Sequence, residues 1–217
     1  MSENNSQYDV IVIGAGVAGL YQLFKLRQLK LKALVIEAGD NVGGTWYWNR
    51  YPGARFDSES WSYGYSFSKE LFEEWDWPEH FAAQPDTLRY LNYVADKFDF
   101  RRDIKFDRRV EACVFDQQNN LWTVRTNTKE EYVARFLITA LGPLSAFTLP
   151  NIEGRETFKG PAYHTARWPH EEVDFSGKRV GIIGTGACAI QTIQTIAKDV
   201  AHLTVFQRSP NWAAPLN

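Results

Sequence analysis

Cysteine is scarce in this sequence, and neither sign of charge is in excess. The 217 residues include only two cysteines, Cys113 and Cys188. Two cysteines cannot form a disulfide framework, and their separation fits no metal-ligand spacing. Lys and Arg number 24 against 26 Asp and Glu, which gives a formal net charge of −2. This balance gives no support to a nucleic-acid partner, because such binders normally carry a basic excess.

The sequence also predicts no targeting segment, and it has no long apolar run. Residues 1–7 are polar and have neither the basic nor the apolar region of a signal peptide. The first apolar run, residues 10–20, contains three glycines and is too short to cross a bilayer. We therefore expect a cytoplasmic protein that has no membrane partner and binds no metal.

Tryptophan, by contrast, is abundant. Five of the eight tryptophans lie between Trp46 and Trp77. Trp48, Trp61, Trp75 and Trp77 have no assigned role, so we expect each of them to pack in a core. With 44% hydrophobic residues, the chain can bury the core of one large domain or of two small ones.

Two segments of the chain follow the same order of strand, glycine turn, helix and strand. In the first, strands are predicted at residues 8–13 and 33–37, with the turn at residues 14–19. In the second, whose turn starts 170 residues later, strands are predicted at residues 178–183 and 203–206. The connections are short, so each pair of strands is expected to be parallel with a right-handed crossover.

The segment between these two βαβ units has a different pattern. A helix is predicted over residues 86–98, and strands over residues 109–116, 121–126 and 131–139 alternate around turn residues. Residues 41–67 are rich in glycine, proline and aromatics, so we expect an ordered functional loop followed by irregular structure there. The predicted fold class is α/β, with two Rossmann-like βαβ units, parallel sheets and a small antiparallel β-meander in the first domain.

The first glycine turn has the pattern of a dinucleotide-binding site. Gly14 makes the tight bend, Gly16 lets a pyrophosphate approach the backbone, and Gly19 lets helix and strand pack closely. Glu37 ends the second strand 23 residues after Gly14, where a carboxylate can accept hydrogen bonds from ribose hydroxyls. On these residues the cofactor is FAD or NAD.

The second glycine turn differs in ways that favour NADP. Gly184 and Gly186 match the first two glycines, and Ala189 replaces the third. The same offset of 23 residues leads to Gln207, followed by Arg208. A carboxylate there would repel a 2′-phosphate, whereas an amide beside a guanidinium can bind it through charge-assisted hydrogen bonds. Two dinucleotide sites in one chain imply hydride transfer from a nicotinamide to a flavin.

Two further segments carry a family resemblance. Residues 43–57 match G-G-x-W-x-x-x-x-[FY]-P-G-x-x-x-D, and residues 158–169 match F-x-G-x-x-x-H-x-x-x-W-P. With both glycine turns, these motifs resemble the Baeyer–Villiger monooxygenases of the phenylacetone and cyclohexanone monooxygenase type. The resemblance covers nearly the whole chain. It implies FAD and NADPH as cofactors, and a C4a-peroxyflavin that inserts one oxygen atom of O₂ beside a ketone carbonyl to give an ester or lactone.

The resemblance also assigns roles to individual residues. Asp57 would orient an active-site arginine that is not present in this chain, and His164 and Trp168 would link NADP binding to catalysis. The residues implied to bind FAD are Gly14, Gly16, Gly19, Glu37, Gly43, Gly44 and Trp46. The residues implied to bind NADP are Gly184, Thr185, Gly186, Ala189, Gln207 and Arg208.

From these motifs we predict how the chain is divided. Residues 1–142 would form the FAD-binding domain, residues 143–175 a connector, and residues 176–217 the start of an NADP-binding domain. One βαβ unit does not complete a doubly wound sheet, so we expect a fragment that is inactive alone. A missing C-terminal part of the same polypeptide would supply the arginine and the substrate pocket. Ala187 and Cys188 stand where the family usually has hydroxyl residues, which removes a ligand for phosphate.

There are three alternatives to this reaction, and two of them are catalytic. Disulfide oxidoreductases also join FAD and NAD(P) units, but Trp46 stands near the place of their redox cysteines and the sequence has no C-x-x-C or C-x-x-x-x-C. We therefore exclude that activity. A flavin enzyme that oxygenates nitrogen or sulfur is the nearest catalytic alternative. A nucleotide-binding fragment without turnover is the alternative from another class.

Overall fold

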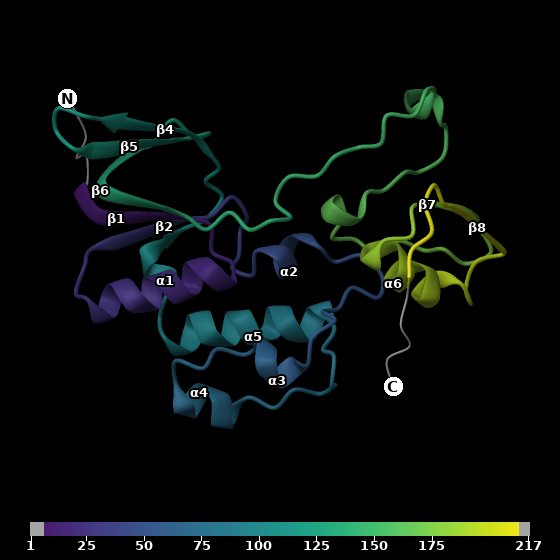
Figure 1. Cartoon of the computed structure of the whole chain (residues 1–217), viewed down its shortest axis with the longest axis horizontal. Coiled ribbons are helices and arrows are strands. Elements are labelled where there is room, and N and C mark those ends of the chain that lie inside the picture. Colours follow the sequence, from purple (N-terminus) through teal and green to yellow (C-terminus); the bar gives the residue numbers. More distant parts are fainter. Residues whose placement is uncertain (1–6, 213–217) are drawn as a thin grey trace. The chain divides into compact units, whose positions relative to one another are not determined.

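The computed structural model describes residues 7–212, which form two compact units (Figure 1). The first unit contains residues 7–48 and 87–149, and the second contains residues 49–86 and 150–212. The segment with the first family motif therefore contributes to both units, because its first two glycines, Gly43 and Gly44, fall in the first and its final aspartate falls in the second.

A six-stranded mixed sheet is the centre of the first unit. Its strands are β1 (Gln7–Ile13), β2 (Ala33–Ile36), β3 (Ile104–Lys105), β4 (Val110–Asp116), β5 (Leu121–Thr126) and β6 (Glu131–Thr139). They lie in the order β3-β2-β1-β6-β5-β4. β1 pairs in parallel with both β2 and β6, and β4, β5 and β6 are antiparallel neighbours. The predicted meander is thus continuous with the parallel strands through β6.

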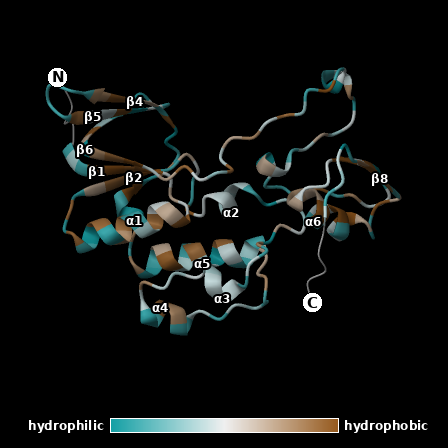
Figure 2. Ribbon diagram, in the orientation of Figure 1, coloured by the Kyte–Doolittle hydropathy of each residue, from teal (hydrophilic) through white to brown (hydrophobic). Residues whose placement is uncertain are grey.

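The parallel strands are apolar because helices and neighbouring strands cover them. All four residues of β2 are buried, as are Val10–Ile13 of β1, which is the pattern of a strand that is covered on both faces. Figure 2 shows these strands as hydrophobic. A buried cluster joins the parallel part of the sheet to the meander; its members are Ile11, Leu34, Ile36, Val124, Tyr132 and Ala134.

Two long helices accompany this sheet. α1 (Val17–Gln28) contacts β1 and β2 and buries Leu20, Leu23 and Leu26. α5 (Gln84–Lys97) buries Tyr90, Leu91, Val94 and Ala95, one apolar stripe at helical spacing. The remaining helical turns of this unit are α2 (Thr45–Trp48) and η1 (Arg101–Asp103).

The second unit contains a smaller parallel pair of strands. Its elements are α3 (Ser60–Tyr63), α4 (Lys69–Glu74), η2 (Arg155–Thr157), η3 (Thr165–Arg167), β7 (Arg179–Ile183), α6 (Ala187–Ile196) and β8 (His202–Phe206). β7 and β8 pair in parallel, with Ile183 opposite Phe206 at their carboxyl ends. The second βαβ unit is therefore present as predicted from the sequence.

Several details differ from the expectations. Residues 41–67, predicted as an ordered loop followed by irregular structure, contain the short helices α2 and α3. α6 begins at Ala187, with Gly186 as its N-cap. Trp61 is 59% exposed, so the prediction that it packs in a core is wrong. Its helix is only four residues long and buries Ser60 instead. No helix within residues 7–212 is long and apolar enough to cross a membrane.

Candidate functional site

The first glycine turn joins β1 directly to the start of α1. Gly14 has a φ of +104°, a conformation that favours glycine. Its N–H donates to the carbonyl of Ile36 at 2.8 Å, and Gly16 is the N-cap of α1. These contacts bring the helix N-terminus, with its free N–H groups, to the carboxyl ends of the parallel strands.

Close backbone packing explains the glycines of this turn. A Cβ at Gly19 would lie 1.8 Å from the carbonyl oxygen of Gly14, so helix and strand pack too closely for any side chain. A Cβ at Gly44 would lie 2.7 Å from the Cα of Gly16. Gly43 donates from its N–H to the carbonyl of Ala15 at 3.1 Å. The loop around Gly43 and Gly44 therefore packs directly on the turn.

Glu37 places a buried carboxylate at the same edge of the sheet. The residue is 4% exposed, and its Oε2 accepts a hydrogen bond from the N–H of Ala15 at 2.7 Å. Its Oε1 accepts a hydrogen bond from the N–H of Gly39 at 2.8 Å. The carboxylate thus fixes both the turn and the loop that follows β2, and each oxygen retains a lone pair for a ribose hydroxyl.

Trp46 lies in α2, directly after the two loop glycines. It is 7% exposed, and its N–H donates to the carbonyl of Gly43 at 3.0 Å. Gly43 has a φ of +130°, and a Cβ there would lie 2.5 Å from a methyl group of Leu88. This site combines glycine backbone without side chains, the N-terminus of α1 and a carboxylate at a strand end. Together these groups fit the pyrophosphate and ribose of a dinucleotide such as FAD.

The second glycine turn repeats the backbone of the first. Gly184 has the same φ of +104°, and its N–H donates to the carbonyl of Phe206 at 2.9 Å. Gly186 is the N-cap of α6, and within residues 7–212 no atom beyond its chain neighbours lies within 4 Å of a Cβ built on it. Ala189 occupies the first turn of α6. This turn likewise leaves a helix N-terminus open to a phosphate.

The repeated hydrogen bond fixes which residues correspond. Gly14 bonds to Ile36, whose neighbour is Glu37, and Gly184 bonds to Phe206, whose neighbour is Gln207. Gln207 therefore stands at the position of the first unit's acid.

Gln207 and Arg208 differ in their partners. The amide of Gln207 donates to the hydroxyl of Thr185 at 3.1 Å, across the glycine turn. Arg208 is exposed and forms no ion pair with the residues that the structure describes. Its guanidinium remains available to a 2′-phosphate.

The other predicted site residues lie in the second unit. Asp57 is exposed and follows the buried Phe56. His164 is half-buried, and its Nδ1 accepts a hydrogen bond from the N–H of Ala166 at 3.1 Å, so it caps η3. Trp168 ends the same turn, and its ring lies 5.3 Å from that of Tyr163. The first unit thus brings together the proposed FAD residues, whereas the second holds Asp57 and the proposed NADP residues.

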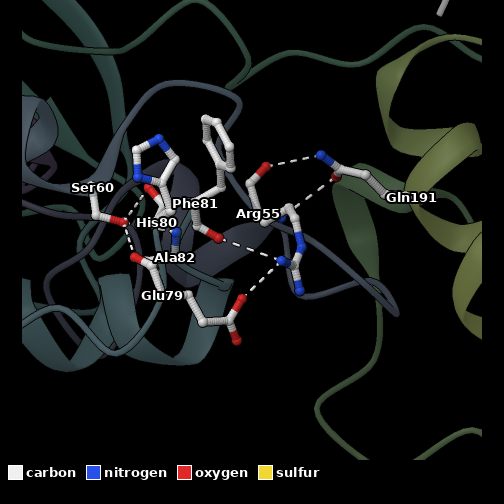
Figure 3. A network of polar contacts seen from close by, with 7 residues as sticks. All are labelled: Arg55, Ser60, Glu79, His80, Phe81, Ala82 and Gln191. Atoms are coloured by element: carbon white, nitrogen blue, oxygen red, sulfur yellow. Dashed lines mark hydrogen bonds and ion pairs between the residues drawn. The ribbon is translucent and has the colours of Figure 1, made fainter. Parts of the chain in front are cut away.

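Sequence reasoning missed two residues that the structure brings together with this motif. Gln191 of α6 is bonded to the backbone of Arg55, two residues before Asp57 (Figure 3). The hydroxyl of Tyr51 donates to the same amide at 2.8 Å. The sequence signal for this contact is Gly53, the glycine of the Pro-Gly pair within the motif.

Comparison with known proteins gives relatives along the whole chain. One is 2-oxo-Δ³-4,5,5-trimethylcyclopentenylacetyl-CoA monooxygenase of Pseudomonas putida, 50% identical over 96% of this chain and 39% of the relative. Acetone monooxygenase (methyl acetate-forming) of Gordonia sp. strain TY-5 is 50% identical over the same shares, 96% and 39%. A phenazine N-monooxygenase of Lysobacter antibioticus is 45% identical over 99% of this chain and 40% of its own. The chain therefore spans about 40% of the length of these relatives.

Solved structures agree with these relatives. A steroid monooxygenase in its oxidized form, bound to NADP, matches with a TM-score of 0.92 and 54% identity over 97% of this chain and 40% of that chain. A protein called OTEMO, in complex with FAD and NADP, matches with a TM-score of 0.92 and 50% identity over 99% of this chain and 41% of that chain. Each of the two βαβ units is thus shared with monooxygenases.

A family model described as pyridine nucleotide-disulphide oxidoreductase matches residues 11–216. Only two cysteines occur, 188 − 113 = 75 residues apart and both free, so membership of this family brings no redox cysteine pair. The resemblance to Baeyer–Villiger monooxygenases is confirmed by the relatives. The chain belongs to the pyridine nucleotide-disulphide oxidoreductase family, and within it is a homologue of the Baeyer–Villiger monooxygenases.

Proposed function

We propose that this chain binds FAD at the first glycine turn and NADPH at the second, as part of an enzyme that inserts oxygen beside a ketone carbonyl. The observation that carries the proposal is the pair of backbone-equivalent turns, one with Glu37 at the strand end and the other with Gln207 and Arg208. An acid suits a free ribose hydroxyl, and the amide and guanidinium suit a 2′-phosphate.

In the proposed reaction, ketone, O₂, NADPH and a proton give ester or lactone, NADP⁺ and water. FAD would supply the redox chemistry, as a hydride acceptor and then as the group that activates dioxygen. The relative that forms methyl acetate from acetone supports this reaction class.

Each group of residues would have a separate task. The N–H groups at the start of α1 and the carboxylate of Glu37 would bind the FAD pyrophosphate and ribose, and Trp46 would pack beside them. The start of α6 would bind the NADP pyrophosphate, with Thr185 and Gln207 beside it. Arg208 would bind the 2′-phosphate.

The remaining motif residues would orient other groups of the enzyme or link its sites. Asp57 would orient an arginine that stabilises negative charge as it develops on oxygen. His164 and Trp168, which stand at the two ends of η3, would link NADP binding to catalysis. The arginine and the ketone pocket would come from a further part of the same polypeptide, since the relatives are about two and a half times as long. The domain limits and the cytoplasmic location given above stay predictions.

Product analysis tests this function. The purified full-length enzyme that contains this chain, with FAD and NADPH, is given a cyclic ketone under ¹⁸O₂, and the product is analysed by mass spectrometry. The proposal expects a lactone that carries one ¹⁸O atom, together with NADPH oxidation that depends on the ketone. Oxidation of NADPH without labelled lactone, for several ketones, would reject it.

Nitrogen oxygenation is the second candidate, because the relative from Lysobacter antibioticus is named for it. The same assay with a tertiary amine and with phenazine separates the two. Labelled N-oxide without any lactone would assign the second activity.

A further inference from the structure

The segment that precedes Asp57 is tied to helix α6 by a single side-chain amide. Gln191 donates from Nε2 to the carbonyl of Arg55 at 2.9 Å, and its Oε1 accepts from the N–H of Arg55 at 3.4 Å. Figure 3 shows Gln191 reaching from the helix to both backbone groups. A primary amide that pairs with the N–H and C=O of one residue imitates a neighbouring strand, so the contact fixes the orientation of the backbone as well as its distance.

Gly53 makes the approach to α6 closer still. It has a φ of +79°, and a Cβ there would lie 2.2 Å from the hydroxyl oxygen of Thr195 and 2.6 Å from the carbonyl oxygen of Gln191. Both of these residues belong to α6. The backbone of the Pro-Gly pair therefore lies directly on the helix, and only glycine fits there.

Tyr51 extends the contact toward the glycine turn. The side chain is 8% exposed, and its hydroxyl donates to Oε1 of Gln191 at 2.8 Å. Burial, and then a side-chain hydrogen bond with Cys188, raise the pKa of Tyr51 far above its ordinary value. The hydroxyl is therefore a neutral donor at all physiological pH values, placed against the second residue of α6.

The opposite side of the segment is held by residues 79–83. Arg55 forms a backbone bridge with Ala83, and its guanidinium lies 2.9 Å from the carboxylate of Glu79 (Figure 3). The hydroxyl of Ser60 accepts from the N–H of Ala82 at 3.0 Å and lies 2.6 Å from the carbonyl oxygen of Glu79. The residues before Asp57 thus lie between residues 79–83 and α6.

We propose that Gln191 is a positioning residue, which couples occupation of the second glycine turn by NADP(H) to the backbone that presents Asp57. This inference rests on the proposed function, because it needs the nucleotide at the N-terminus of α6. A ligand that orders α6 would, through the amide, also order the segment bonded to it. In this arrangement the nucleotide site and Asp57 are linked although no single side chain contacts both of them.

Hydrogen exchange of residues 49–57 tests the coupling. The full-length enzyme that contains this chain is compared with and without saturating NADP⁺, as wild type, Gln191→Leu and Gln194→Leu. Gln194 is exposed on the same helix, so its variant is a matched control for helix composition. We expect NADP⁺ to slow exchange of this segment in the wild type and in Gln194→Leu, and this NADP⁺-dependent change to be lost in Gln191→Leu.

The outcomes separate coupling from stability. If Gln191→Leu exchanges faster but keeps the full NADP⁺-dependent change, the residue is only structural and the proposal is overturned. Tyr51→Phe, which removes one hydroxyl, serves if Gln191→Leu does not fold, and we expect it to lose part of the change. Calorimetry on the same samples reports NADP⁺ binding. Failure of the wild type to bind rejects the proposed function itself, whereas binding with no effect at Gln191 rejects only this inference.

Discussion

An oxygen of the Glu37 carboxylate lies 2.7 Å from the backbone nitrogen of Ala15, inside the first glycine turn. The other oxygen bonds to the N–H of Gly39, and the side chain is 4% exposed. One carboxylate therefore shapes the turn and faces the place where a ribose would bind. Because each oxygen of Glu37 accepts its own backbone hydrogen bond, loss of a single acceptor should disturb the turn.

Glu37→Gln should weaken both the turn and cofactor binding. The amide keeps one acceptor and presents an NH₂ group to a backbone N–H, which leaves a buried donor unsatisfied at a cost of about 1–3 kcal/mol. We expect FAD affinity to fall about tenfold or more. Fluorescence titration with FAD measures this, with Asp40→Asn, an exposed acid three residues on, as control. Equal affinities in the two variants would contradict the role of Glu37.

Alanine should lower stability at Gly19 and nucleotide binding at Gly186. At Gly19 a Cβ would lie 1.8 Å from a backbone oxygen, so Gly19→Ala should lower the free energy of unfolding by about 1–3 kcal/mol. At Gly186 none of the described residues beyond its chain neighbours lies within 4 Å of the added Cβ, so Gly186→Ala should leave thermal stability nearly unchanged. Its Cβ would instead occupy the approach of the pyrophosphate and weaken NADP⁺ binding. Thermal melts and nucleotide titration measure the two effects, and a strong loss of stability in Gly186→Ala would refute the account.

Arg208→Ala should change the choice of coenzyme. Loss of a charge-assisted bond to the 2′-phosphate should raise the dissociation constant for NADPH about tenfold or more, and leave that for NADH nearly constant. Arg179→Ala is the control, because that exposed arginine lies at the opposite end of the β7–β8 pair. Equal losses for both coenzymes would remove Arg208 from the 2′-phosphate site.

Stability in acid should depend on Glu130. Hydrogen bonds from the Thr128 hydroxyl and the Arg108 guanidinium lower the pKa of Glu130 below its ordinary 4.5. A lowered folded pKa gives stability that is present above about pH 4.5 and is lost as the pH falls through the folded value. Glu130→Gln should therefore be less stable than wild type at pH 7, and the difference should shrink toward pH 3. Urea unfolding between these pH values measures it; a constant difference would count against the linkage.

The repeated βαβ unit could be predicted from the sequence because glycine spacing and strand ends are local signals. The offset of 23 residues predicted the place of Gln207, and the matching bonds of Gly14 and Gly184 confirm that register. Strand limits such as 121–126 and 131–139 were also predicted, since alternation and turn residues mark them.

Long-range contacts were not accessible in the same way. Nothing in the local pattern joins Gln191 to Arg55, 136 residues earlier, and the glycine of the Pro-Gly pair shows its purpose only beside α6. Trp61 was expected in a core and is 59% exposed, because residue type alone does not decide which side of a four-residue helix faces the protein.

Anaerobic mixing of the FAD-loaded enzyme with NADPH tests the central claim, that two different dinucleotides bind one chain and exchange a hydride. The account predicts that the visible absorption of oxidised flavin disappears with NADPH. At NADPH concentrations below saturation it should disappear much more slowly in Arg208→Ala. A flavin that stays oxidised in the presence of saturating NADPH would contradict it.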